Sequence, residues 1–373
     1  MENDIYKRLA QHLDNLPGGF PPTESGVELR ILRRLFSPQE AELALHLALI
    51  PEESRVIARR AKVSREDAAR RLEEMAKKGL IFRIEPKGKS PLYQAQQYVI
   101  GIWEFHVNDL DKELVLDMEE YIPVLFEDAW KVPQLRTVPV GRSVSAQVEV
   151  LPYDKVEELV RTQKKFLVAP CICRRELRMV GNGCEKPEET CLVFGMAADY
   201  YERNELGRVI DLQETLDILK MADEEGLVLE PSNSQDIINI CCCCGCCCGI
   251  LRNLKRHPKP ASVVSTSFVV SYNSDTCEGC GTCEDRCQMD AISIDNGKAE
   301  VDVDRCIGCG LCVSTCPTES LTLTRKSESE RPTVPKDVIQ ATIQLGRERG
   351  KLNTFNLIQM QLKSKFDRLL AAK

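Results

Sequence analysis

The chain has 373 residues, of which 43% are hydrophobic and 29% charged, with 19 cysteines and a formal net charge of −7. This length predicts two to four domains, and the composition is ordinary for a soluble protein. No run approaches the ~18 apolar residues of a membrane span, and the charged N-terminus lacks the apolar region of a signal peptide. We therefore expect a cytoplasmic protein whose reduced cysteines bind metal, and so many thiols favour an anaerobic host.

Residues 1–26 are predicted to form a helix and a linker, and residues 27–95 are basic. Residues 26–95 hold fifteen Lys/Arg and ten Asp/Glu, which gives this segment a net charge of about +5. The net charge of the remainder of the chain is therefore about −12. Apolar residues recur at helical spacing in successive segments of this region. Ser64 is a good N-cap for the last of these helices. The segment LIFRIEPKGKSPLYQA then has the pattern of a strand, a turn and a second strand. This segment resembles the winged-helix domains of bacterial transcription factors.

The resemblance implies that the helix beginning at Ser64 would enter the major groove of DNA. The residues that would then contact DNA are Arg65 and Arg70 at the bases, and Lys87 and Lys89 at the phosphates. The alternative is a domain for protein docking or dimerisation, because Glu66 and Asp67 in the first turn would repel phosphates. Fold alone does not decide between them.

Residues 96–165 are predicted to be a connector. The segment QYVIGIWEFHV alternates as a strand does, and DLDKELVLDMEEYIPVLFEDAWKV has the pattern of an acidic amphipathic helix capped by Asp109 or Asp111. A winged helix followed by a long amphipathic helix favours a homodimer over a monomer.

Residues 166–257 form a cysteine-rich α/β module in which we expect a helix to begin near Cys191. Adjacent cysteines make poor disulfide partners, and a core does not need seven cysteines in eight positions. The pattern predicts at least one iron–sulfur cluster, with zinc as the alternative metal. Which of these cysteines are ligands stays open, since consecutive residues cannot all face one metal in a regular backbone. The candidates are Cys171, Cys173, Cys184, Cys191, Cys241, Cys242, Cys243, Cys244, Cys246, Cys247 and Cys248.

The module resembles the cysteine-rich modules that precede ferredoxin domains in uncharacterised iron–sulfur proteins of anaerobic bacteria. Cys173 is followed by Arg174 and Arg175, whose charges would lower thiol pKa values and raise a cluster potential. Gly245 would permit a tight bend beside the metal.

Residues 268–326 contain two copies of the spacing C-x2-C-x2-C-x3-C. Three closely spaced thiolates wrap one face of an iron–sulfur cube, and the fourth reaches the other cube. One [4Fe-4S] cluster is therefore assigned to Cys277, Cys280, Cys283 and Cys316. The second cluster is assigned to Cys306, Cys309, Cys312 and Cys287. The segment resembles the two-cluster bacterial ferredoxin, except that Gln288 stands where a proline usually follows the fourth cysteine of the first copy.

Residues 333–373 are predicted to be helical with a break near Gly350. Their apolar stripe packs either on the body of the protein or on a partner. The whole pattern predicts an α+β, multidomain chain.

The sequence has no P-loop, no Rossmann glycine motif after a strand and no nucleophile elbow. We therefore expect an electron carrier or the electron-transfer subunit of an oxidoreductase, rather than an enzyme acting alone. Its acidic body suits a redox partner protein such as a flavoprotein, without a membrane. Two alternatives remain open, namely a redox-sensing DNA-binding regulator and an oxidoreductase acting on a disulfide or small substrate at the cysteine-rich module.

Overall fold

The computed structural model describes residues 4–129, 132–143, 151 and 154–371. The chain is 45% helical and 15% strand, so the prediction of a mixed α+β, multidomain chain is confirmed. It divides into two compact units, which are described separately. The first comprises Met1–Lys131, Asp199–Leu206 and Thr342–Lys373, and the second comprises Val132–Ala198 and Gly207–Ala341.

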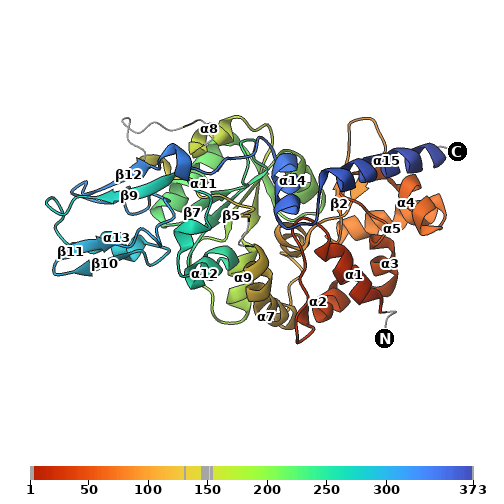
Figure 1. Ribbon diagram of the computed structural model, residues 1–373, viewed down its shortest axis with the longest axis horizontal. Coiled ribbons are helices and arrows are strands. Elements are labelled where there is room, and N and C mark those ends of the chain that lie inside the picture. The colour runs from red at the N-terminus through yellow and green to blue at the C-terminus, as the bar shows by residue number, and fades with distance from the viewer. Residues whose placement is uncertain (1–3, 130–131, 144–150, 152–153, 372–373) are drawn as a thin grey trace. The chain divides into compact units, whose positions relative to one another are not determined.

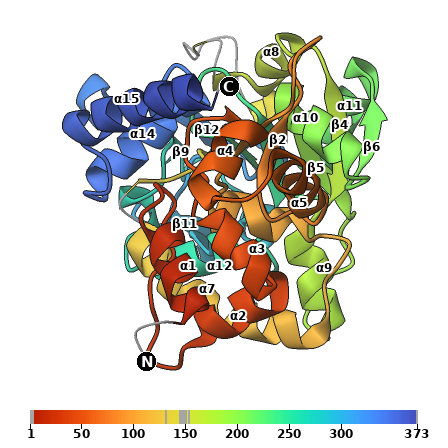
Figure 2. The ribbon, with the colours of Figure 1, turned by 90° about the vertical axis from the view of Figure 1, so that its right-hand side faces the viewer.

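The first unit begins with helices α1 to α5, which are labelled in Figure 2. It also contains a small antiparallel sheet of strand order β1-β3-β2. Ser64 accepts a hydrogen bond from the backbone N–H of Asp67 at 3.1 Å, which confirms it as the N-cap of α5. Lys87 and Lys89 lie exposed in the turn between β2 and β3. The elements are α1 (Ile5–Asp14), α2 (Val27–Leu35), α3 (Pro38–Ala44), β1 (Glu52–Glu53), α4 (Ser54–Ala61), α5 (Arg65–Lys77), β2 (Phe82–Ile84) and β3 (Leu92–Gln94).

The strand predicted at QYVIGIWEFHV is wrong. The segment forms an irregular turn, η1 (Tyr98–Ile102), and a short helix, α6 (Trp103–Phe105). Tyr98, Ile102, Trp103 and Phe105 are all buried, so neither alternate set of side chains faces solvent. The apparent alternation is therefore the pattern of a segment that is buried on all sides.

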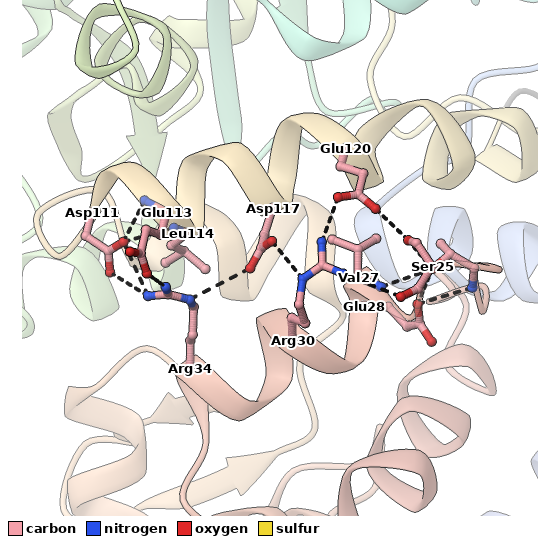
Figure 3. Close-up of polar contacts among 11 residues, drawn as sticks. Ser25, Val27, Glu28, Arg30, Arg34, Asp111, Glu113, Leu114, Asp117 and Glu120 are labelled. Carbon is pink, nitrogen blue, oxygen red and sulfur yellow. Dashed lines mark hydrogen bonds and ion pairs between the residues drawn. The ribbon is translucent and has the colours of Figure 1, made fainter.

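The acidic helix predicted next is α7 (Lys112–Ala129), and Asp111 rather than Asp109 caps it by accepting hydrogen bonds from the backbone of Glu113 and Leu114. Acidic side chains of α7 pair with basic side chains of α2 (Figure 3). Arg30 lies 3.0 Å from Asp117 and 2.6 Å from Glu120, and Arg34 pairs with Asp111, Glu113 and Asp117.

The C-terminal segment forms α14 (Val338–Glu348) and α15 (Thr354–Leu370), with the predicted break at Gly350, where φ is +68°. The packed side of α15 is polar. Ser364 donates to Glu52 at 2.6 Å, and Asp367 pairs with Arg59 and Arg60 of α4. The apolar stripe is exposed on the opposite side, with Phe355 72% and Leu369 74% accessible.

The second unit contains a five-stranded antiparallel sheet of order β6-β4-β5-β8-β7. Its strands β5 and β7 are labelled in Figure 1. The helix predicted to begin near Cys191 is wrong, because Glu189–Phe194 is strand β5 and the helix begins at Gly195. The run from Thr190 to Phe194 is almost wholly apolar, as in a strand buried on both faces, and it lies between β4 and β8. The strands are β4 (Phe166–Pro170), β5 (Glu189–Phe194), β6 (Arg208–Ile210), β7 (Val228–Pro231) and β8 (Asn239–Cys243).

Helices follow or connect these strands. They are α8 (Val156–Arg161), α9 (Ile172–Met179), α10 (Gly195–Arg203), α11 (Leu212–Glu224) and α12 (Gly249–Arg256), with single turns η2 (Gly141–Ser143), η4 (Pro260–Ser262) and η5 (Glu328–Glu330). Within the part of the chain that the structure describes, no helix combines the length and the apolar character needed to cross a membrane.

Residues 268–326 form two antiparallel strand pairs in the second unit, at the left of Figure 1. Strand β9 (Phe268–Tyr272) pairs with β12 (Leu321–Arg325), and β10 (Ile292–Asp295) pairs with β11 (Lys298–Val301). One short helix, α13 (Thr282–Arg286), contains Cys283, the third cysteine of the first repeat, and Cys287, the fourth, follows it directly. The first strand thus pairs with the last, which brings the two repeats together.

Candidate metal centres

The first predicted cluster site is a pocket between the two ferredoxin repeats. Its lining includes Cys277, Cys280 and Cys283 of the first repeat and Cys316 of the second, together with Tyr272. The pairing of β9 with β12 places Cys316 there, because Leu321 at the start of β12 and Ser320 just before it line the same pocket. The structure therefore brings together the four cysteines that the spacing assigned to one cluster.

The second predicted site gathers Cys287 from the first repeat and Cys306, Cys309 and Cys312 from the second, which lie close enough to influence one another's charge. Burial raises the pKa of the Cys309 thiol to about 12. A thiol must lose its proton to bind metal, so iron binding at this buried site would release protons. The assignment of these cysteines as ligands remains a prediction.

Backbone geometry around both sites suits iron–sulfur ligation. The N–H of Gly279 points to the sulfur of Cys277 at 3.4 Å, and that of Ala291 to Cys287 at 3.2 Å. Hydrogen bonds of this kind stabilise cluster thiolates. Gly279 has φ +67°, and a Cβ there would lie 2.1 Å from the carbonyl oxygen of Gly297. Only glycine fits this turn, and the donor set therefore matches the cofactor that the spacing predicts.

Strand β8 sorts the first cysteines of the cysteine run by the alternation of a strand. Cys241 and Cys243 lie on one face of the sheet, whereas Cys242 lies on the other with Ile240. Burial raises the pKa of the Cys242 thiol. Cys242 is therefore a core residue, and the other ten cysteines of the module divide into two sets.

The first set, the sheet set, has six cysteines and one carboxylate. Cys241 lies directly opposite Cys191 of β5 on one side and Glu230 of β7 on the other, so these three occupy one row. The sulfurs contact one another in the order Cys171, Cys173, Cys248, Cys243, Cys241 and Cys191. Glu230, Cys243 and Cys248 place their ligand atoms within 4.8 Å of one another.

Hydrogen bonding along this row of thiols lowers some pKa values and raises others, and the pKa values of Cys171 and Cys243 are raised through their hydrogen bonds to Cys173 and Cys241. Hydrogen bonds from Cys173 and Cys243 lower the pKa of the Cys248 thiol to about 7. Hydrogen bonds from Cys191 and Cys243 lower the pKa of Cys241 as well. Burial raises the pKa of the Glu230 carboxyl to about 8. Thiols that share protons in this way release them readily when a metal binds.

The second set, the loop set, consists of Cys184, Cys244, Cys246 and Cys247. All four sulfurs lie within 4.8 Å of one another. The sulfur of Cys184 is 3.9 Å from that of Cys244 and 3.6 Å from that of Cys247. A hydrogen bond from Cys247 lowers the pKa of the Cys244 thiol to about 4.

Arg174 is fully buried and lies between the two sets. Its guanidinium donates to the backbone carbonyl oxygens of Cys242 at 2.7 Å and Pro187 at 2.8 Å, and its charge acts on Cys171, Cys243 and Cys244. A buried cation needs nearby negative charge, which thiolates of the two sets would supply. The sequence predicted this role for Arg174 together with Arg175, but Arg175 instead pairs with Glu188.

The cysteine-rich module and the ferredoxin repeats meet on both sides of Cys287. Arg286 donates to the carboxylate of Asp223 in α11 at 3.0 Å, and Ser314 donates to the same oxygen at 2.9 Å. The side chain of Gln288 accepts a hydrogen bond from the N–H of Gly245 at 2.7 Å. Cys287, a predicted ligand of the second cluster, therefore lies between two residues that contact the cysteine-rich module.

The predicted nucleic-acid residues all lie in the first unit, and two of the four contact other residues of that unit. Arg65 donates to the backbone oxygen of Ala371 at 3.2 Å, and Arg70 pairs with Asp67 and Glu74 of its own helix. Lys87 and Lys89 are exposed. Contact of these residues with DNA remains a prediction, since Arg70 is 60% exposed despite its ion pairs.

Residues 270–323 match the family model of the 4Fe-4S dicluster domain. The match covers well under half of the chain, so it identifies this segment as an iron–sulfur domain of ferredoxin type and leaves the rest unassigned. No curated protein and no solved structure matches the chain. Together with the clustered cysteines of the module, the match indicates an iron–sulfur electron-transfer protein.

Glu230 and Asp223 were not among the residues that the sequence predicted. A signal for Glu230 existed, because it is a carboxylate within the otherwise apolar strand segment LVLEP. Asp223 carried no signal, since it lies in an acidic helix end where charged residues are usual. Its partners come from another part of the sequence, and only the fold shows them.

Proposed function

We propose that this chain is an iron–sulfur electron-transfer protein, or the electron-transfer subunit of a larger oxidoreductase, serving a cytoplasmic partner enzyme such as a flavoprotein. Cys277, Cys280, Cys283 and Cys316 would hold one [4Fe-4S] cluster, and Cys306, Cys309, Cys312 and Cys287 the other. When bound, such clusters supply one-electron chemistry at low potential. The protein supplies burial, N–H donors and fixed spacing.

The sheet set is the proposed site of a further iron–sulfur centre. Six thiolates and a carboxylate exceed the four ligands that a single tetrahedral ion takes, so they suit a cluster of several irons. Buried Arg174 would offset part of the negative charge of that centre. It would thereby favour the reduced form and raise the potential.

The observation that carries the proposal is the anchoring of Cys287 by Arg286 and Gln288. These contacts join the ferredoxin repeats to the cysteine-rich module within one compact unit. A fixed separation between redox groups is what a relay requires, whereas a simple storage protein has no need of it.

The test is iron and acid-labile sulfide per chain on protein purified without oxygen, with electron paramagnetic resonance during a reductive titration. We expect about eight irons from the ferredoxin repeats and additional iron at the sheet set. Cys243→Ser should remove the additional iron and its signal, whereas Cys242→Ser should not. An iron content of only about eight, unchanged in Cys243→Ser, would refute the further centre. Absence of reducible clusters would refute the function.

A second candidate function is regulation of transcription. The order of elements from α2 to β3, with exposed Lys87 and Lys89 in the β2–β3 turn, favours a winged helix for residues 27–95. The pairing of Arg65 and Arg70 within the unit favours a docking role over DNA binding. Salt-dependent binding of a specific duplex, lost in the double variant Lys87→Ala, Lys89→Ala, would support the regulator instead.

A further inference from the structure

The loop set has a sulfur spacing that differs from the spacing a cube requires. Four thiolates on one tetrahedral ion lie roughly 3.8 Å apart, as metal–sulfur bonds of about 2.3 Å dictate. Thiolates that bind different irons of a cube lie farther apart, because the cube lies between them. The Cys184 sulfur lies 3.9 Å from the sulfur of Cys244 and 3.6 Å from the sulfur of Cys247. One distance is slightly longer and the other slightly shorter than the roughly 3.8 Å expected for two ligands of the same ion.

We propose that Cys184, Cys244, Cys246 and Cys247 bind a single tetrahedral zinc ion. All four ligands come from the protein and leave no open coordination position, which is the arrangement of structural zinc sites. Thiolate ligands in tetrahedral geometry suit zinc, and zinc binds such sites more tightly than a single ferrous ion does. This inference goes beyond the proposed electron transfer and does not rest on it.

The ferredoxin repeats provide an internal contrast. There, Cys277, Cys280, Cys283 and Cys316 line a pocket that has about 330 Å³ of empty volume, open solvent at its mouth included. The sulfurs are held around a space, as a cube needs. In the loop set, by contrast, all four sulfurs lie within 4.8 Å of one another. The sheet set differs from it as well, because its six sulfurs follow one another as a chain of pairwise contacts.

The fold explains how four such cysteines converge. Cys244, Cys246 and Cys247 lie in the turn after β8, which is closed by a hydrogen bond from the N–H of Cys248 to the carbonyl of Cys244 at 3.1 Å. This turn breaks the alternation of the strand, so adjacent Cys246 and Cys247 face the same point. Cys184 comes from the loop between α9 and β5, where its carbonyl accepts from Arg178 at 2.9 Å.

The zinc ion would fix the turn that contacts the ferredoxin repeats. Gly245 lies inside the loop set, and its N–H donates to Gln288. The ion therefore acts as a structural cross-link between the loop after α9 and the turn after β8. It holds Gly245 in place beside the residue that follows Cys287, and it takes no part in electron transfer.

The experiment measures zinc and iron per chain in the full-length protein purified without oxygen. We expect about one zinc per chain. Cys184→Ser and Cys246→Ser should each lose the zinc and keep the iron. Two controls are matched to them: Cys242→Ser, from the same run, should keep both metals, and Cys280→Ser, exposed like Cys246, should lose iron and keep zinc.

X-ray absorption at the zinc edge is measured on the unmutated protein, so its result does not depend on whether the variants fold. Four sulfur neighbours at about 2.3 Å are the expected result. Loss of iron from Cys184→Ser, an absence of zinc, or zinc with nitrogen or oxygen neighbours would each overturn the proposal. Failure of the electron-transfer function would appear separately, as ferredoxin clusters that are absent or cannot be reduced.

Discussion

The N–H of Gly245 lies 2.7 Å from the side-chain oxygen of Gln288, and a Cβ at position 245 would lie 2.3 Å from the backbone oxygen of the same residue. Glycine is thus required for the close approach of the two backbones. Gln288 also occupies the position where the ferredoxin pattern has proline. Its amide side chain serves a contact that a proline ring has no group to make.

Gly245→Ala should destabilise the second unit by about 1–3 kcal/mol, because the added methyl group forces the backbones apart. Gln288→Ala should cost about 1 kcal/mol through the lost hydrogen bond. Denaturation followed by loss of cluster absorbance measures both. Gln213→Ala, an exposed glutamine that bonds only within its helix, is the control. Equal stability of Gly245→Ala and the unmutated protein would contradict the close approach.

Asp223→Ala should lower the free energy of unfolding of the second unit by about 3–5 kcal/mol, since it leaves the charge of Arg286 buried without its partner. The Asp223 and Arg286 side chains are only 5% and 15% exposed. The midpoint of urea denaturation reports this change. Lys220→Ala removes an exposed pair of the same helix and should change the midpoint little. A small effect of Asp223→Ala would mean that the contact between α11 and the ferredoxin repeats adds little to the stability of the second unit.

Arg174→Met should make the potential of the additional centre more negative, because a buried positive charge beside the thiolates is removed. For a one-electron couple, a loss of about 1.4 kcal/mol corresponds to about 59 mV. A redox titration monitored by electron paramagnetic resonance measures the shift. Arg175→Gln is the control, since this neighbour pairs with Glu188 at the edge of the module. An unchanged potential in a correctly folded Arg174→Met would contradict the electrostatic role.

Asp117→Ala should destabilise the first unit by about 1 kcal/mol, because Asp117 pairs with both Arg30 and Arg34. The effect should shrink in high salt, as expected for pairs near the surface. Thermal unfolding at two ionic strengths checks both statements. Glu113→Gln affects a pair whose carboxylate is 78% exposed, so it should have almost no effect. A salt-independent loss would point to packing instead of charge.

The first unit should lose stability as the pH falls below about 6.5. Burial lowers the pKa values of His12, His46 and His106, so the unfolded chain binds protons that the folded unit does not. The contribution of these histidines to stability is therefore fully present above a pH of about 6.5. It is lost as the pH falls through their lowered pKa values in the folded unit. Fluorescence of buried Trp103 in a Trp130→Phe variant follows this unit, and a pH-independent unfolding midpoint would contradict the expectation.

The ferredoxin segment was predictable from sequence because its ligands are local and regularly spaced. The helices from residue 27 to residue 77 were predictable through caps such as Ser64. The errors came where burial on all sides removed the periodic pattern, as at Trp103 and along β5. The division of the eleven module cysteines depends on strand pairing across about 50 residues, which a single sequence does not specify.

The face that β8 presents depends on its register, because a slip of one residue turns every side chain to the opposite side. A slip in one direction would put Cys242 and Cys244 where Cys241 and Cys243 now lie, so the sheet face would still carry two thiols. A run of four cysteines is thus poorly protected against misregistration by its own pattern. The same slip would withdraw Cys244 from the loop set, so a metal ion bound there would select the correct pairing as the chain folds.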